Sequence, residues 1–514
     1  MAGEGLRAMR MMDYFDQGFR RRVGAPAFIA GEQRVSWEAA QARVERVAAA
    51  MAARGIAAGM RVGVYSPNDI DAFFAILAAF RLGAVWVPIN ARNSEKANRH
   101  WLALMECRCL FFHPALEAET ERLRPALPED ALLVRLDRLE AFEAEAQGPA
   151  PLPPHAPDTL ASVFPTGGTT GLSKAAEWTL QTWETMLATF WQCMPCETTP
   201  VHLVAGPMTH AAGVLAFCCL PGGATNVILP KADPAAILDA IERYRVTHLY
   251  LPPTLVYSLL DQPGVRERDY GSLHYLVIAA APISPARLKE AVEVFGPVVC
   301  QSYGQAEAPM FMTFLPSRDL VAGPESRWSS CGRSTLATRL EIMDAAGAML
   351  PDGERGEIVA RGNLVTRGYY RDPEATAAAR HEGWHRTGDI GVRDEMGFLH
   401  IVDRARDMII TGGFNVYSVE VEQVILSHPA VRDCAVFGVP DPKWGEAVNA
   451  AVELKEDARA EPEEIIALVK ARLGSVHAPK TVTFWAELPR SPVGKVLKRE
   501  IRDRYWNGRE RAVG

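Results

Sequence analysis

Apolar residues between positions 36 and 90 follow two alternating spacings. The stretches 36–55 and 70–83 repeat apolar residues every three or four positions and end in glycine, as helices with a glycine C-cap do. The stretches 61–66 and 84–90 are short and rich in valine, which is typical of strands. Helices that alternate with strands predict a mostly parallel sheet covered by helices.

A second run of the same kind lies further along the chain. It contains expected helices at 232–246 and 284–296 and expected strands at 247–253 and 297–304. We therefore expect two doubly wound sheets. The stretch 148–158 carries five prolines and cannot continue a helix, so we interpret it as a surface connector between them.

The pattern changes in the last third of the chain. Short glycine-punctuated strands from about residue 330 predict an antiparallel or barrel-like piece. After Arg406, expected helices and strands are mixed, which is typical of a small α+β domain. The helices are expected at 418–431 and 463–474, and the strands at 433–441 and 481–489.

Length and charge limit the possible functions. A chain of 514 residues is too long for one core, and a net charge of −7 with a pI near 6.0 gives no basic field for nucleic acid or anionic membranes. The nine cysteines lack zinc-site spacing, and the N-terminus lacks the apolar core of a signal peptide. The longest apolar patches, 211–220 and 276–283, are too short for a membrane span. We expect a cytoplasmic protein with reduced thiols, without nucleic-acid binding or integral membrane association.

The most informative stretch is VFPTGGTTGLSKAAEWT, residues 163–179. It combines three glycines, four threonines, one serine and one lysine, and such loops supply backbone N–H groups, hydroxyls and positive charge to phosphate oxygens. It is not a Walker loop, because Leu172 and Ser173 separate Gly171 from Lys174. Taken alone, a polar glycine loop is usually only a turn.

Together with seven further motifs, this loop resembles the phosphate loop of the adenylate-forming superfamily, and within it the acyl-CoA synthetases. The further motifs occur in the family order: PMTHAAG (207–213), AAAP (279–282), QSYGQAE (301–307), WHRTGD (384–389), DRARDMIITGGFNVYSVEVE (403–422), VPDPKWGE (439–446) and PRSPVGKVLKR (489–499). The resemblance covers nearly the whole chain. It implies an α/β fold with a large N-terminal domain, residues 1–405, of two doubly wound sheets and a distorted β-barrel. A small mobile α+β domain, residues 406–514, would follow a hinge at Arg406.

The resemblance implies an enzyme that uses ATP, Mg²⁺ and coenzyme A to convert a carboxylic acid first to its adenylate and then to its CoA thioester. Lys174, Glu307 and Lys495 would be the catalytic residues, with Glu307 and Thr170 holding the metal ion. Tyr303 would stack on adenine, Asp389 and Arg404 would bind the ribose, and Lys495 would stabilise charge between carboxylate and α-phosphate. The implied nucleotide-binding residues are Thr166, Gly167, Gly168, Thr169, Thr170, Gly171, Lys174, Ala280, Ala281, Pro282, Ser302, Tyr303, Gly304, Gln305, Ala306, Asp389, Arg404 and Lys495.

For the second step, the resemblance implies a thiol channel lined by Gly412, Gly413 and Trp444. A plain hairpin turn is an alternative interpretation of ITGGFN, and both can hold together. Lys498 and Arg499, which follow the catalytic lysine, are expected to be solvated.

The acyl pocket would be mostly apolar, which favours a fatty or an aryl acid over a dicarboxylate or an amino acid. His210 would gate it, although a helix-capping or core histidine is a fair alternative. The implied pocket residues are His210, Ala211, Val214, Phe217, Ala281, Ser302, Pro309 and Met310.

The chain departs from the family pattern at Ala306, where the family has a threonine that contacts the α-phosphate. Loss of one such hydrogen bond costs about 0.5–1.5 kcal/mol, and Gln305 or a water could replace it.

Two other functions are compatible with the sequence. The enzyme could load its acyl group onto a carrier protein instead of CoA. The chain could also be an inactive nucleotide-binding regulator, although the intact charged residues argue against this. Its partners would be the small-molecule acid, ATP and CoA, and the resemblance implies a monomer or a homodimer.

Overall fold

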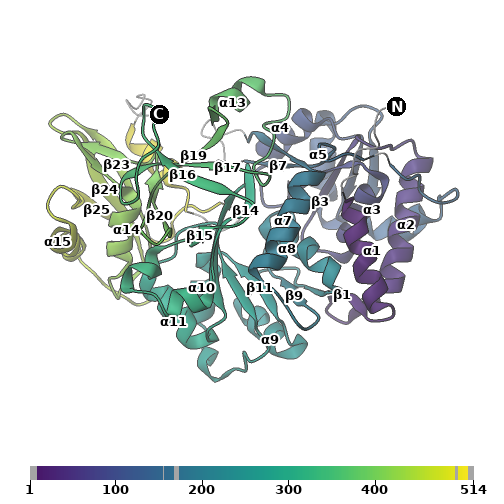
Figure 1. The fold of residues 1–514 in the computed structure, drawn as a ribbon, viewed down its shortest axis with the longest axis horizontal. Coiled ribbons are helices and arrows are strands. Elements are labelled where there is room, and N and C mark those ends of the chain that lie inside the picture. The colour runs from purple at the N-terminus through teal and green to yellow at the C-terminus, as the bar shows by residue number, and fades with distance from the viewer. Residues whose placement is uncertain (1–8, 154, 167–172, 492–495, 507–514) are drawn as a thin grey trace.

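The computed structural model describes residues 9–153, 155–166, 173–491 and 496–506. Their strands form four sheets, with nine, six, five and five strands. Helices α1 (Met11–Arg22), α2 (Trp37–Ala53) and α3 (Ile70–Leu82) lie at one end of the molecule, and the C-terminal elements lie at the other (Figure 1).

The six-stranded sheet contains the first predicted helix–strand run. Its order is β6-β5-β3-β4-β7-β8, and all neighbours are parallel except the β7–β8 pair. The predicted helices 36–55 and 70–83 are confirmed as α2, capped by the Ser36 side chain, and α3, ended by Gly83 at φ 71°. The strands are β3 (Arg61–Ser66), β4 (Val85–Asn90), β5 (Cys109–Phe112), β6 (Leu132–Arg135), β7 (Leu160–Pro165) and β8 (Ala175–Thr179), and further helices are α4 (Glu95–Met105), α5 (Glu117–Leu123) and α6 (Leu139–Glu143).

The nine-stranded sheet contains the second predicted run, in the order β15-β14-β13-β12-β11-β9-β10-β1-β2. Strand β1 comes from the N-terminal region and pairs with β10, a long-range contact that local patterns did not predict. Strand β2 pairs with β1 and forms the edge of the sheet. The strands are β1 (Pro26–Ala30), β2 (Gln33–Ser36), β9 (Val201–Val204), β10 (Thr225–Ile228), β11 (His248–Leu251), β12 (Tyr275–Ile278), β13 (Val299–Gln305), β14 (Ala308–Leu315) and β15 (Arg333–Ser334). The helices are α9 (Pro234–Tyr244), α10 (Pro253–Leu260), α11 (Pro285–Phe295) and α12 (Ser317–Val321).

One aromatic core joins the two large sheets. Helices α3, α7 (Leu180–Cys193) and α8 (Ala211–Cys219) supply much of it. The ring of Phe217 on α8 lies within 5.8 Å of four aromatic rings, measured between centroids: Phe73, Phe80, Trp86 and Trp183. Burial of such large side chains is the main favourable term in folding.

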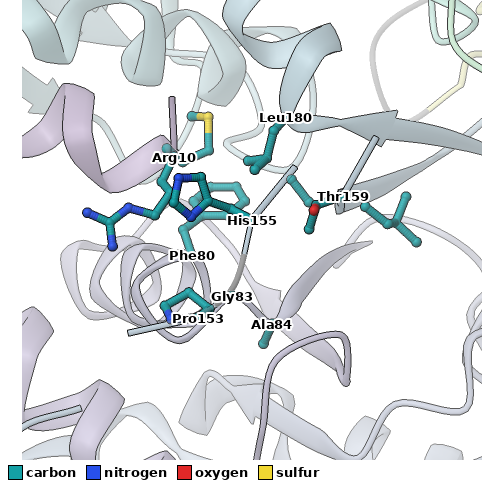
Figure 2. Close-up of a pocket in the computed structure, with 11 residues that line it drawn as sticks. Arg10, Phe80, Gly83, Ala84, Pro153, His155, Thr159 and Leu180 are labelled. Atoms are coloured by element: carbon teal, nitrogen blue, oxygen red, sulfur yellow. The ribbon is translucent and has the colours of Figure 1, made fainter. Parts of the chain in front are cut away.

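The proline-rich stretch does not separate the two sheets, contrary to the prediction. Its described residues are neither helix nor strand, as expected, but they lead from α6 to β7, and β6 and β7 belong to the same six-stranded sheet. Pro153 and His155 of this stretch line a pocket together with Arg10 and Phe80 (Figure 2). Arg10, the residue before α1, forms an ion pair with Asp13 of that helix at 2.7 Å.

The predicted antiparallel piece forms the first five-stranded sheet, in the order β16-β17-β19-β18 with β20 beside β19. Its strands are β16 (Arg339–Met343), β17 (Arg355–Arg361), β18 (Arg380–His381), β19 (Trp384–Arg393) and β20 (Leu399–Arg404), and α13 (Pro373–Ala378) lies between β17 and β18.

The C-terminal elements enclose an apolar cluster of their own, which runs from Ile409 to Val482. The predicted mixture of helices and strands is confirmed. The strands are β21 (Ile409–Thr411), β22 (Phe414–Val416), β23 (Val431–Asp441), β24 (Gly445–Leu454) and β25 (Thr481–Trp485), and the helices are α14 (Ser418–Leu426), α15 (Pro462–Leu473) and α16 (Lys498–Trp506). Among the described residues, no helix combines the length and the hydrophobicity that a bilayer crossing requires.

Candidate active site

The glycine- and threonine-rich loop is flanked by a hydrogen-bonded stem at the edge of the six-stranded sheet. Strands β7 and β8 pair up to Pro165 and Ala175, and the Thr166 N–H then donates to the Lys174 carbonyl at 2.9 Å. Thr166 is buried. The predicted residues Gly167, Gly168, Thr169, Thr170 and Gly171 lie outside the described residues. The stem places both ends of the loop at the carboxyl end of β7, where open α/β sheets bind ligands.

Tyr369 links the lysine of this loop to the predicted metal-binding carboxylate. The Lys174 ammonium lies 4.9 Å from the centroid of the Tyr369 ring, and the Tyr369 hydroxyl donates to Glu307 Oε1 at 2.8 Å. Burial and the nearby Glu307 carboxylate raise the pKa of Tyr369, so the phenol stays protonated and can donate. Sequence reasoning missed Tyr369, and the only available signal was the aromatic pair at 369–370.

Glu307 occupies a tight turn between β13 and β14. Gln305 pairs with Ala308, and the two carbonyls of the turn are both bonded: Ala306 accepts from the Trp178 indole at 2.7 Å, and Glu307 accepts from the Thr366 N–H at 2.8 Å. Trp178 lies on β8, so this bond ties the turn to the stem of the loop. Gly304 is required nearby, because an added Cβ would lie 2.4 Å from the Met310 nitrogen.

A second carboxylate lies next to this turn. Asp389 Oδ2 accepts from the Tyr303 hydroxyl at 2.6 Å and from the Gln305 amide at 2.7 Å. Its other oxygen lies 3.3 Å from Arg404 Nε, and Asp389 and Arg404 are paired residues of β19 and β20. The neighbouring Asp389 raises the pKa of Arg404. The structure thus brings together four residues that were predicted from separate motifs.

Other predicted nucleotide-binding residues lie on or just after two adjacent parallel strands, β12 and β13. Ala280, Ala281 and Pro282 begin two residues after the end of β12, with Ala280 and Pro282 exposed and Ala280 in the left-handed region at φ 76°. Ser302, on the neighbouring strand β13, is buried, and its hydroxyl has no hydrogen-bond partner among the described residues.

A hollow opens beside Glu307 and Tyr369, and it includes a histidine that sequence reasoning left without a role. His385, from the WHRTGD motif, is buried, and its Nε2 lacks a partner among the described residues. Burial lowers the pKa of His385, although the Glu307 carboxylate opposes this effect. The hollow is lined by Glu307, Thr366, Gly368, Tyr369, Thr376, Ala379, Arg380 and His385.

The predicted acyl-pocket residues occupy two different settings. His210 precedes α8 without a side-chain capping bond, and burial lowers its pKa to about 4. Phe217 lies in the aromatic core together with buried Val214. Pro309 and Met310 follow the Glu307 turn, with Met310 at φ 63°. Ala211 begins α8, and only its backbone is described.

The predicted thiol-channel motif forms a hairpin. Thr411 pairs with Phe414, and both intervening glycines have positive φ, 58° at Gly412 and 83° at Gly413, as a two-residue hairpin requires. The Gly412 N–H donates to the Trp444 carbonyl at 2.8 Å, and an added Cβ at Gly412 would lie 2.8 Å from the Trp444 ring. Trp444 is 42% exposed.

Helix α16 shows that one prediction was wrong. Lys498 is not solvated, because its side chain is only 20% exposed and its ammonium lies 2.7 Å from both Glu422 Oε1 and the Ser418 hydroxyl. The N–H and hydroxyl of Ser418 both donate to Asp403, on the other side of the predicted hinge residue Arg406. We call Asp403, Ser418, Glu422 and Lys498 the hinge cluster. Arg499 is half exposed, as expected, and Lys495 lies outside the described residues.

Comparison with known proteins places this geometry in a family. Residues 15–370 match the AMP-binding enzyme family, and residues 420–495 match the AMP-binding enzyme C-terminal domain. The chain belongs to the AMP-binding enzymes, in the acyl-CoA synthetase branch of the adenylate-forming superfamily, and it is an enzyme of the AMP-forming carboxylate–CoA ligase class.

Its relatives differ in the acids that their names specify. It is 36% identical to the medium/long-chain-fatty-acid–CoA ligase FadD8 of Mycobacterium tuberculosis, covering 96% of this chain and 90% of that protein. It is 35% identical to a feruloyl-CoA synthase of Amycolatopsis, covering 90% and 92%. The solved structure of the amide bond synthetase McbA from Marinactinospora thermotolerans matches with a TM-score of 0.88 at 32% identity, covering 96% of this chain and 100% of that chain.

Proposed function

We propose that this enzyme activates a hydrophobic carboxylic acid, fatty or aryl, with ATP and then transfers the acyl group to coenzyme A. The observation that carries the proposal is the cluster around the turn at Glu307. There the lysine of the phosphate loop, the Glu307 carboxylate and the Asp389–Arg404 pair are connected through Tyr369, Tyr303 and Gln305.

The phosphates of ATP would lie between the glycine- and threonine-rich loop and Glu307. Lys174 supplies positive charge on one side, and its contact with the Tyr369 ring holds the ammonium at the mouth of the stem. A single carboxylate suits Mg²⁺, which is usually held by one or two carboxylates and the substrate phosphates, so Glu307, with Thr170, would hold it. Bound there, the ion would neutralise charge that develops on the phosphates.

The nucleoside would lie on the other side of the same turn. The Tyr303 hydroxyl and the Gln305 amide orient Asp389, whose carboxylate can then accept hydrogen bonds from the ribose hydroxyls. Both N–H groups of Gln305 are engaged, one with Asp389 and one with the Thr387 carbonyl at 2.9 Å. Gln305 therefore cannot replace the threonine absent at position 306 unless these bonds break, and we assign that contact to water.

The two reactions would require two arrangements of the C-terminal residues 406–514. In the first, the Lys495 ammonium would lie between the acid and the α-phosphate. In the second, rotation about Arg406 would bring the Gly412–Gly413 hairpin and Trp444 to the same place, so that the CoA thiol can attack. Two glycines at the hairpin tip leave room for a narrow pantetheine arm.

The reaction is proposed to take place in the cytoplasm. All nine cysteines are free thiols, which suits a reducing compartment.

The proposal is tested by measuring AMP release from ATP with a panel of fatty and aryl acids, with and without CoA. We expect CoA-dependent AMP release and thioester formation with at least one class of acid. Pyrophosphate exchange without any thioester would instead favour the alternative acceptor, the phosphopantetheine arm of a carrier protein. No pyrophosphate release with any acid would contradict the proposal.

A further inference from the structure

Three buried polar residues lie side by side on the face of the nine-stranded sheet that contacts the aromatic core. Asn226 on β10 is the register partner of His202 on β9, which is the register partner of His248 on β11. All three are fully buried. We call Asn226, His202 and His248 the polar row.

Each member of the polar row has an atom without a partner. The His202 Nδ1 lies 3.1 Å from Asn226 Oδ1, and the His248 Nδ1 lies 2.8 Å from the Thr247 hydroxyl. The His202 Nε2, the His248 Nε2 and the Asn226 Nδ2 have no hydrogen bond among the described residues. Buried polar atoms without partners are costly, and they are rare in folded proteins.

The unpaired atoms of His202 and Asn226 determine which ligand group could form hydrogen bonds with both residues. If Asn226 Oδ1 accepts from His202, the free atoms are an acceptor on His202 and a donor on Asn226. If the amide is turned the other way, the donor is on His202 and the acceptor on Asn226. Either assignment leaves one donor and one acceptor. A hydroxyl group, which can donate and accept at once, matches both.

The polar row lies on the same nine-stranded sheet as Ser302, Tyr303 and Gln305 of the candidate active site. His248 begins β11, three residues before its last residue Leu251, so the row lies about 10 Å below the carboxyl end of the sheet. Helix α8, which starts immediately after His210, packs across β9 and β11 (Figure 1). An acyl group that enters beside His210 and extends between α8 and the sheet would point its far end toward the row.

The surroundings of the row are apolar and keep its histidines neutral. The His248 ring lies 5.9 Å from the Phe190 ring and 5.2 Å from the Tyr275 ring, measured between centroids. Burial lowers the pKa of His202 to about 4 and that of His248 to about 3. Neutral imidazoles offer one donor and one acceptor nitrogen each, and they do not attract a carboxylate at the far end of a substrate.

From this geometry we infer that the polar row is the far end of the acyl pocket, and that it selects an elongated apolar acid carrying a hydroxyl group about 10 Å from its carboxylate. This inference rests on the proposed function. It narrows the substrate from any fatty or aryl acid to one with a hydroxylated far end. A site built to hydrogen-bond a substrate hydroxyl rejects the analogue that lacks it, because the buried groups then stay unpaired.

The test compares matched acids that differ only by the hydroxyl. Octanoate is compared with ω-hydroxyoctanoate, and cinnamate with para-hydroxycinnamate, each by kcat/KM for CoA-dependent AMP release. We expect the wild-type enzyme to prefer the hydroxylated member of at least one pair by roughly 10-fold or more. Equal use of both members of each pair would overturn the inference but not the proposed function. If no acid supports pyrophosphate release, the proposed function fails as well.

Two variants test whether the polar row causes the preference for the hydroxylated acid. In Asn226→Leu, the ratio of kcat/KM for the hydroxylated acid to kcat/KM for the plain acid should fall close to one. The reason is that the side chain at position 226 can no longer complete the donor–acceptor pair with His202. Asn98→Leu is the matched control, since Asn98 is an equally buried asparagine bonded to the Asn90 carbonyl in the first sheet. The Asn98→Leu variant should lower the melting temperature without changing this ratio of kcat/KM values. If Asn226→Leu only lowers the melting temperature and keeps the ratio, the row binds a structural water and the inference is wrong.

Discussion

Tyr369 matters because it touches two groups of opposite charge. Its ring supports the Lys174 ammonium, and its hydroxyl holds one oxygen of Glu307. Glu307 is therefore oriented before any nucleotide binds. Preorganised charge of this kind is often the largest contribution to catalysis, since no reorganisation is needed during the reaction.

Tyr369→Phe should keep the contact with Lys174 and remove the hydrogen bond to Glu307. The ring remains for Lys174, but Glu307 loses a hydrogen bond of the kind worth about 1.5–3 kcal/mol when one partner is charged. We expect acid-dependent ATP–pyrophosphate exchange to fall roughly 10-fold or more. Tyr370→Phe removes the neighbouring hydroxyl and serves as the control, with an unchanged rate expected. An unchanged rate in Tyr369→Phe would show that the bond to Glu307 has no role in activation.

Site residues that belong to sequence motifs could be predicted from the sequence. Residues whose setting depends on partners far away in the sequence could not. Glu307, Asp389 and Arg404 stand in recognisable stretches, and the structure brings them together. The burial of Lys498 was missed because its partner Glu422 is far away in sequence and nothing local distinguishes Lys498 from its exposed neighbour Arg499.

At the scale of elements, the hairpin β21–β22 has the geometry that its proposed role needs. Its two glycines adopt backbone angles that other residues avoid, and its tip rests on Trp444. Elements with strong local periodicity, such as α2 and α3, were predicted closely. The pairing of β1 with β10 was not, because it depends on contacts between residues nearly two hundred positions apart.

Gly412→Val should impair the second reaction and spare the first. The added side chain would collide with the Trp444 ring and strain the positive φ, so the tip of the hairpin must move. We expect unchanged pyrophosphate exchange and slower thioester formation. Gly413→Ala is the comparison, because an added Cβ there meets nothing within 4 Å and tests strain alone. Thioester formation at the wild-type rate in Gly412→Val would remove the hairpin from the proposed thiol channel.

The hinge cluster predicts a pH dependence of stability. Burial raises the pKa of Glu422 from 4.5 to about 7, so the folded protein binds a proton that the unfolded chain has released between these values. This group therefore contributes stability at low pH that is lost as the pH rises through about 7.

The measurement is the melting temperature of the wild type and of Glu422→Gln from pH 5 to pH 8. The difference between the two proteins should change with pH, with the wild type losing stability relative to the variant as pH rises. Glu420→Gln, on the same helix, is the control for the loss of an ion pair, because the Glu420 carboxylate lies 2.7 Å from Arg355 Nη2. A difference between the wild type and Glu422→Gln that does not change with pH would contradict the assignment of this proton to Glu422.

At the scale of the whole molecule, the proposed mechanism depends on two arrangements of residues 406–514. The structure shows one arrangement, in which Asp403 bonds Ser418 across the predicted hinge and Lys498 joins the same cluster. Lys498 lies three residues after Lys495 in the sequence, so we propose that the hinge cluster also anchors the proposed catalytic lysine. The proposed rotation about Arg406 would require this anchor to open and close.

The most direct test is to measure the two half-reactions separately in Lys495→Ala. One assay follows acid-dependent ATP–pyrophosphate exchange, and the other follows thioester formation from CoA and a supplied acyl-adenylate. We predict that exchange is abolished while thioester formation stays close to the wild-type rate, because Lys495 would be needed only in the first arrangement. Equal loss of both activities would contradict it.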